Sequence, residues 1–213
     1  MNQTRILLCL LLALSALPVL ASPPTDLPLS PAETRSLNTF FSNFSEVLLE
    51  PFAAQEVSDS LLIAFALGHN QRNNPQRFVA GTEEGTLRIQ APLLDETTRR
   101  FFGRAIRTHQ ALPARDIQFR DGWYQIFEGS GEVFFFSRID RLEALGNDLF
   151  TAHVRVYSAG SGWTGDVHGT EADWKKADPG DIPELTERMK ATLKKITEKG
   201  KSRYILIDYS PAS

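Results

Sequence analysis

The chain has almost no cysteine. Cys9 is the only one among 213 residues, and it lies in an apolar stretch near the start. Disulfides, thiol chemistry and cysteine-ligated metals are therefore excluded from the rest of the chain. The fold must be stabilised by burial of apolar side chains, and a chain of this length can form one core of ordinary size.

The chain also lacks a basic patch and the common catalytic motifs. Its formal net charge is −3, so it gains no general attraction to nucleic acid or to anionic lipid. It contains no glycine-rich phosphate loop, no Gly-x-Ser-x-Gly elbow and no His-Glu-x-x-His motif. These absences argue against nucleotide enzymes and common hydrolases. We expect no nucleic-acid partner and no cofactor.

The first 21 residues have the order of a secretory signal peptide. Arg5 supplies positive charge, residues 6–17 are almost wholly apolar, and small residues at Val19 and Ala21 precede the expected cut. The apolar run is shorter than the ~20 residues that span a membrane. We expect cleavage after Ala21, export to the periplasm or the extracellular space, and no membrane insertion after cleavage. An uncleaved anchor is the alternative.

A proline-containing segment, residues 22–30, reads as a flexible leader before a single domain at residues 31–213. Ser30 and Glu33 have the spacing of a capping box, with a proline at the first helical position. Apolar residues then recur at helical spacing. We predict a helix over residues 31–49.

Two further helices and a strand are predicted before residue 110. Ser58 or Asp59 can cap the second helix, which ends near the glycine of residues 68–70. A short strand at residues 85–91 precedes a third helix at residues 92–106.

The pattern then changes to runs of aromatic and β-branched residues. The predicted strands are residues 117–120, 123–128, 133–145 and 149–158, and short glycine-containing turns separate them. This order favours a series of antiparallel hairpins. Residues 158–183 form a long polar loop, of a kind that is often functional.

The C-terminal part has two interpretations. Apolar residues at 185, 189, 193 and 196 have helical spacing, whereas residues 191–197 and 204–209 also fit a hairpin. We favour a short helix at residues 184–188 followed by the hairpin. Helices followed by antiparallel strands give an α+β class, here with N-terminal helices packed on a strongly curved sheet.

Four segments carry a resemblance: LNTFFSNF at residues 37–44, RFFG at 100–103, DGWY at 121–124 and YILIDY at 204–209. In these segments and in element order, the chain resembles the NTF2-like (cystatin-like) superfamily, and within it small secreted bacterial proteins. The resemblance covers most of residues 31–210. It implies a cone-shaped curved sheet, but it fixes no function, because the superfamily includes enzymes, ligand binders and structural adaptors.

Isomerase and dehydratase members of that superfamily use a carboxylate or histidine base and a tyrosine donor inside the cone. The matching candidates here are His153, Tyr157 and Asp208, which lie on predicted strands. The alternative, which we favour, is that these side chains occupy an outer, solvent-facing side of the sheet, with Arg155 paired to an acid.

The long loop contains a second set of candidates. Asp166 and His168 could supply two metal ligands, but a metal site usually needs three or four, so we expect no metal and place both residues, with the loop tryptophans, among the candidate contacts for a ligand or partner. Trp163 and Trp174 either pack because the loop folds back, which we favour, or form a contact surface for a ligand or partner. Residues 134–136 are three phenylalanines, so both faces of that strand need a cover: the long loop, a pocket or a second subunit.

Two functions follow from these patterns. The first is a non-catalytic exported domain that binds a small apolar or amphipathic ligand, or a protein partner, with a homodimer through the sheet as one arrangement. The second is an NTF2-like enzyme with a polar pocket on the curved sheet. An open cone that contains two or more of the polar candidates would favour the enzyme.

Overall fold

A computed structural model of the protein describes residues 25–54, 57–129 and 134–212. The predicted signal peptide lies outside the described residues. Within these ranges the chain forms four α-helices and two antiparallel sheets, so the predicted α+β class is confirmed. None of the helices in the described ranges combines the length and apolarity that a membrane crossing requires.

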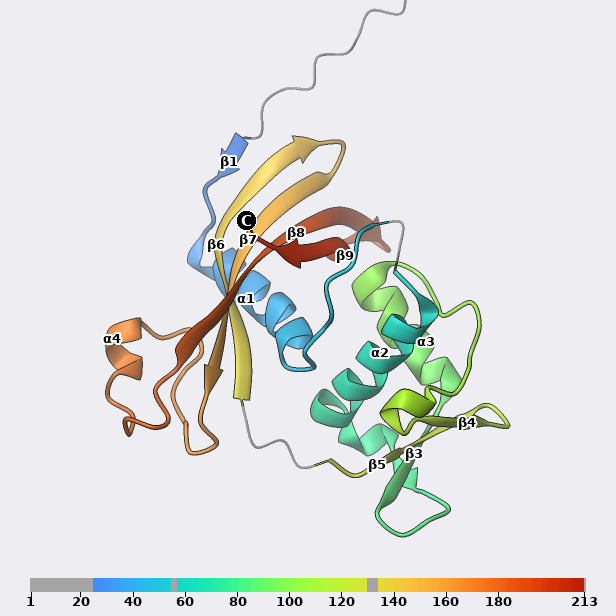
Figure 1. Cartoon of the computed structure of the whole chain (residues 1–213). Coiled ribbons are helices and arrows are strands. Elements are labelled where there is room, and N and C mark those ends of the chain that lie inside the picture. Colours follow the sequence, from blue (N-terminus) through green and yellow to red (C-terminus); the bar gives the residue numbers. More distant parts are fainter. Residues whose placement is uncertain (1–24, 55–56, 130–133, 213) are drawn as a thin grey trace, which may run out of the picture.

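The larger sheet has the strand order β1-β6-β7-β8-β9. Its strands are β1 (Thr25–Leu27), β6 (Phe134–Gly146), β7 (Leu149–Ala159), β8 (Glu184–Glu198) and β9 (Lys201–Pro211). All neighbouring strands are antiparallel. In Figure 1 the long strands bend around helix α1 (Pro31–Ser45), which lies against one face of the sheet.

Tight turns connect the long strands where the sequence predicts them. Asn147 and Asp148 have positive φ between β6 and β7, as does Gly146 at the end of β6, and Lys199 and Gly200 have positive φ between β8 and β9. Left-handed conformations of this kind match the twist of a two-residue hairpin. The turns therefore fix the register of both hairpins.

The segment expected to be a leader contributes a strand. Thr25, Asp26 and Leu27 pair with residues 142–144 of β6. Pro28 follows this pairing instead of interrupting it, so the missing amide of proline costs the sheet no hydrogen bond there. The leader interpretation is therefore wrong for these three residues.

The end of the chain differs from the favoured prediction. Glu184–Glu198 is one continuous strand, so the short helix expected at residues 184–188 is wrong, whereas the hairpin is confirmed. Met189, Ala191 and Leu193 alternate onto the core face and are at most 2% exposed. The spacing of four between Met189 and Leu193 is also even, so it fits one face of a strand as well as one face of a helix.

A second, smaller sheet has the order β2-β3-β5-β4. Its strands are β2 (Val79–Ala80), β3 (Thr86–Gln90), β4 (Gln118–Arg120) and β5 (Trp123–Phe127). The sequence predicts a single sheet in which the strand at 123–128 turns into the next at 133–145. Instead β5 pairs with β3 and β4, while β6 belongs to the other sheet. The expectation of one sheet is wrong because alternation identifies a strand but not its partners.

Helix α1 begins as predicted and ends early. The Ser30 amide donates to the Glu33 carboxylate at 2.9 Å, and the Ser30 hydroxyl accepts the Glu33 amide at 3.3 Å, so the capping box is confirmed. The helix ends at Ser45, before the predicted end at Leu49, because Leu48 has a positive φ of 51°.

Helix α2 (Asp59–Asn73) begins with the Ser58 hydroxyl accepting the Leu61 amide at 3.1 Å. It continues through Gly68, where the sequence predicts a stop. A Cβ at Gly68 would lie 3.0 Å from Val47 Cγ1. The glycine therefore allows a close approach of the segment after α1, and it does not cap the helix.

Helix α3 (Ala91–Phe102) ends where Gly103 adopts a φ of 71°, short of the predicted end at Ile106. One more short helix, α4 (Glu171–Trp174), lies inside the long loop and begins at a capping box of Thr170 and Asp173. The loop is therefore ordered around a helical turn that the sequence does not predict.

The main core forms between the helices and both sheets. Leu37, Phe41 and Phe44 of α1 lie in the same buried cluster as Val154 and Val156 of β7, as the sequence predicts. Phe41 and Phe44 have no exposed surface. We call this cluster the main core.

Helix α1 also has a buried polar stripe that faces the edge of β6. Asn38 Oδ1 accepts the Ile139 amide at 2.8 Å, and Ser42 Oγ accepts the Ser137 amide at 3.0 Å. The Ser137 hydroxyl donates to Ser45 Oγ at 3.0 Å. Side chains of a helix thus satisfy backbone groups that would otherwise need a neighbouring strand.

Candidate functional site

A groove of about 590 Å³ lies between α1, the C-terminal end of α3 and the β8–β9 hairpin. Its apolar lining comes from Leu29, Leu37, Phe40, Phe101 and Tyr204. The rings of Phe40 and Phe101 lie 5.9 Å apart, and Phe101 is buried in the main core. The volume falls within the range of about 300–1,000 Å³ that is typical of small-molecule sites. We refer to this feature as the groove.

The cations that line the groove differ in how they are paired. Arg203 Nη2 lies 3.0 Å from the Glu198 carboxylate, and the same guanidinium donates to the Arg100 carbonyl. The Arg100 guanidinium lies over the Phe101 ring, 5.3 Å from its centroid. In the described part of the chain, no acid lies within 4 Å of the Lys195 ammonium.

Electrostatics connect the two sides of the groove. Hydrogen bonds from Ser30 hold the pKa of Glu33 below its usual range, and the charge of Lys195 lowers it further. Burial raises the pKa of Tyr204, and the charge of Glu33 adds to this effect. At neutral pH the groove therefore holds an ionised Glu33 and the protonated phenol of Tyr204.

His153 lies on the other face of the large sheet. Its chain neighbours Ala152 and Val154 are buried in the main core, so the imidazole points away from it. His153 Nε2 lies 3.3 Å from Glu143 Oε1, and Arg155 Nε lies 2.6 Å from Asp140 Oδ1. This is the outer-face arrangement that the sequence left open as the alternative, with Arg155 paired to an acid.

Tyr157 and Asp208 do not join His153. The Tyr157 hydroxyl lies 3.3 Å from Glu171 Oε1, and its ring is 4% exposed. Asp208 pairs with Thr192 of β8, so a whole strand separates it from β7. Among the described residues no hydrogen bond or ion pair connects these three side chains, so the expected base and donor do not converge.

The two loop tryptophans pack inward. With Phe134, Phe136, Tyr157 and Val167 they form a second aromatic cluster, which we call the loop cluster. Trp163 stacks on Phe136 at 5.2 Å and 8°, and Trp174, which is 3% exposed, meets the same ring edge-on at 5.1 Å. The loop therefore folds back and packs its tryptophans, as we favoured from the sequence. It covers the outer face of the strand that contains the three consecutive phenylalanines.

Asp166 and His168 support this loop from within. The Asp166 carbonyl accepts a hydrogen bond from the Trp174 indole N–H at 2.8 Å. The Asp166 carboxylate accepts one from the His168 amide, also at 2.8 Å. Burial lowers the pKa of His168, and the charge of Arg35 acts in the same direction. The described residues contain no group of three or more potential ligands that could hold a metal ion.

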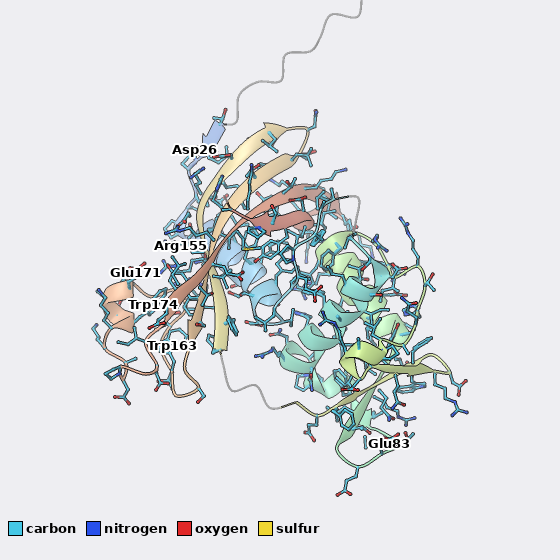
Figure 2. All side chains as sticks on the ribbon, in the orientation of Figure 1. Asp26, Glu83, Arg155, Trp163, Glu171 and Trp174 are labelled. Carbon is cyan, nitrogen blue, oxygen red and sulfur yellow. The ribbon has the colours of Figure 1, made fainter. Side chains whose placement is uncertain are left out.

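A smaller cleft of about 420 Å³ lies beside the loop cluster. In Figure 2, Arg155, Glu171, Trp163 and Trp174 gather where α4 and its loop cover the sheet. Glu171 lies 3.1 Å from Arg155 Nη1, and Asp140 lies 3.5 Å from Arg188 Nη1. Arg155 and Arg188 are thus paired with acids, whereas Lys175, which also lines the cleft, has no acid within 4 Å among the described residues, as is the case for Lys195 in the groove.

Sequence reasoning misses the groove residues, because they come from five separate segments. The sequence does contain a signal for two of these residues, Lys195 and Tyr204. A two-residue turn at Lys199 and Gly200 sets Glu198 opposite Lys201, and counting back places Lys195 opposite Tyr204. The contribution of Phe101 and Arg100 from α3 has no such signal.

Comparison with known proteins finds no match for this chain. No model of a known protein family matches the chain, and neither a curated protein nor a solved structure is significantly similar to it. The interpretation of the groove therefore depends on its own geometry and charge.

Proposed function

We propose that this is a non-catalytic binding protein that holds a small amphipathic molecule in the groove. The observation that carries the proposal is the groove itself: about 590 Å³, with an aromatic and aliphatic floor and a few polar groups at its border. Sites for small molecules combine these features, because the apolar wall supplies affinity and the polar groups fix orientation.

The polar groups of the groove suit binding better than acid–base chemistry. Glu33, the carboxylate in the lining, is held by both the amide and the hydroxyl of Ser30. An enzyme of the isomerase type would need a free base close to a donor, and His153 lies on the opposite face of the sheet. None of His153, Tyr157 and Asp208 lines the groove.

Export and the relationship to NTF2-like proteins remain predictions from the sequence. They are compatible with the proposal, because an exported binding domain of that superfamily would also present a site beside a curved antiparallel sheet. The proposal does not depend on either.

A neutral fluorescent probe, N-phenyl-1-naphthylamine, tests the proposal. We expect saturable binding with enhanced fluorescence, because the probe is apolar and fits the volume. Ser36 is exposed and lines the groove, so Ser36→Trp should fill it and weaken binding at least tenfold.

Arg35→Trp is the matched control, since Arg35 is exposed on the same helix and lies outside the lining. Thermal unfolding should show both variants folded. The proposal fails if the probe does not bind saturably, or if the two tryptophans weaken binding equally.

A further inference from the structure

The hairpin end of the groove has an unpaired cation beside a phenol. Lys195 and Tyr204 are directly opposite each other on β8 and β9, and both line the groove. Residues opposite each other in an antiparallel pair have Cβ atoms roughly 5 Å apart on one face. Among the described residues, the Lys195 ammonium has no ion-pair partner and the Tyr204 hydroxyl has no hydrogen-bond partner.

The charge around the groove leaves one positive charge uncompensated. The lining contains the cations Arg100, Lys195 and Arg203 and the acid Glu33. Glu198 neutralises Arg203 at 3.0 Å. The remaining two cations face one acid, and the groove is therefore complementary to a single negative charge.

We propose that the ligand of the groove is an amphipathic monocarboxylate, whose head group is bound by the Lys195 ammonium and the Tyr204 hydroxyl. Its apolar chain lies along Leu37, Phe40 and Phe101. This inference rests on the proposed function and names the class of ligand.

The chemistry of the head group follows from these two side chains. An ammonium and a phenol both donate to a carboxylate, and charge-assisted hydrogen bonds of this type are about twice as strong as neutral ones. Because burial and the charge of Glu33 raise the pKa of Tyr204, its hydroxyl keeps the proton that it donates.

Other head groups fit less well. An alcohol would lack the negative charge that the Lys195 ammonium can bind. An amine would be repelled by Lys195. A phosphate monoester would bring a second negative charge toward the ionised Glu33.

Three ligands with the same ten-carbon chain test the inference: decanoate, decanol and decyl phosphate. Their dissociation constants are measured by displacement of the naphthylamine probe, below the concentration at which each aggregates. We expect decanoate to bind at least tenfold more tightly than decanol and more tightly than decyl phosphate.

Lys195→Met should weaken decanoate binding at least tenfold and leave decanol binding unchanged. Lys194→Met is the control, because Lys194 is the adjacent residue of β8 and lies outside the lining. It should change neither affinity. Tyr204→Phe should weaken decanoate binding several-fold.

Equal affinities for decanoate and decanol, equal losses in the two lysine variants, or tighter binding of decyl phosphate would each overturn the inference. In those cases decanol binding that is blocked by Ser36→Trp would leave the proposed function intact. If none of the three ligands displaces a probe that Ser36→Trp excludes from the groove, the inference fails and the proposed function stands. If the probe itself does not bind saturably, both proposals fail.

Discussion

The main core and the loop cluster are both built from aromatic rings, yet they differ in what closes them. The main core lies between α1, α2, α3 and two sheets, and rings of Phe44, Phe65, Phe101 and Phe102 contact one another there. The loop cluster covers the opposite side of β6 and β7 with residues 160–183 alone. The first can open only when the fold unfolds, whereas the second can open when one loop moves.

Strand β6 contributes to both clusters. Phe135 packs against the main core, while Phe134 and Phe136 belong to the loop cluster. Substitutions on the two sides of this sheet therefore compare global with local stability in one molecule.

Phe44→Ala should have the largest effect. Phe44 has no exposed surface and lies among other aromatic rings, so its truncation should lower the free energy of unfolding by ~3–5 kcal/mol. Chemical denaturation measures this loss. Phe127→Ala is the control, because Phe127 is 57% exposed and should cost less than about 0.5 kcal/mol. Similar losses in the two variants would contradict the assignment of the main core.

Acid should destabilise the main core through His69. Burial lowers the pKa of this imidazole from 6.5 to about 4, with the charges of Arg100 and Arg77 acting in the same direction. The folded state favours neutral His69, so the unfolded chain binds the additional proton between these two values. Stability should fall as the pH falls from 6.5 to about 4, by up to about 3 kcal/mol.

The measurement is denaturant unfolding at several pH values. His69→Gln should be less stable at neutral pH and should show a flatter profile across the same window. A profile that is as steep in the variant as in the parent protein would assign the acid effect to other groups.

Trp174→Ala should have the smallest of these effects on global stability, about 1–2 kcal/mol, although its ring is as buried as those of the main core. The reason is that the loop can open without global unfolding. Amide hydrogen exchange in residues 169–177 should accelerate much more than exchange in β7. A global loss as large as that of Phe44→Ala would show that the loop cluster and the main core unfold together.

Local signals predict most of the elements. The Ser30 and Ser58 caps set the starts of two helices, and the glycine turns set the two long hairpins. Each of these features depends on residues within a few positions of one another, which is why the sequence alone is sufficient.

Long-range pairing was not predictable in the same way. The pattern of β5 fits any antiparallel neighbour, and nothing in it selects β3 over β6. The groove has the same limitation, because Phe40, Phe101 and Lys195 meet only through the packing of α1, α3 and β8. For the catalytic candidates, the local pattern was predicted but the site was not. His153 and Tyr157 alternate with buried residues along β7 as predicted, but this alternation does not reveal which face of the sheet holds a cavity.

The polar stripe of α1 has a consequence for how copies of this protein meet. A sheet grows when a strand from another chain adds to an open edge. On β6 that edge is occupied by β1 at residues 142–144 and by Asn38 and Ser42 at the Ser137 and Ile139 amides. Side chains of a helix thus protect part of this sheet edge, and replacing both with alanine would leave the Ser137 and Ile139 amides without these acceptors and make the edge more open to pairing with another chain.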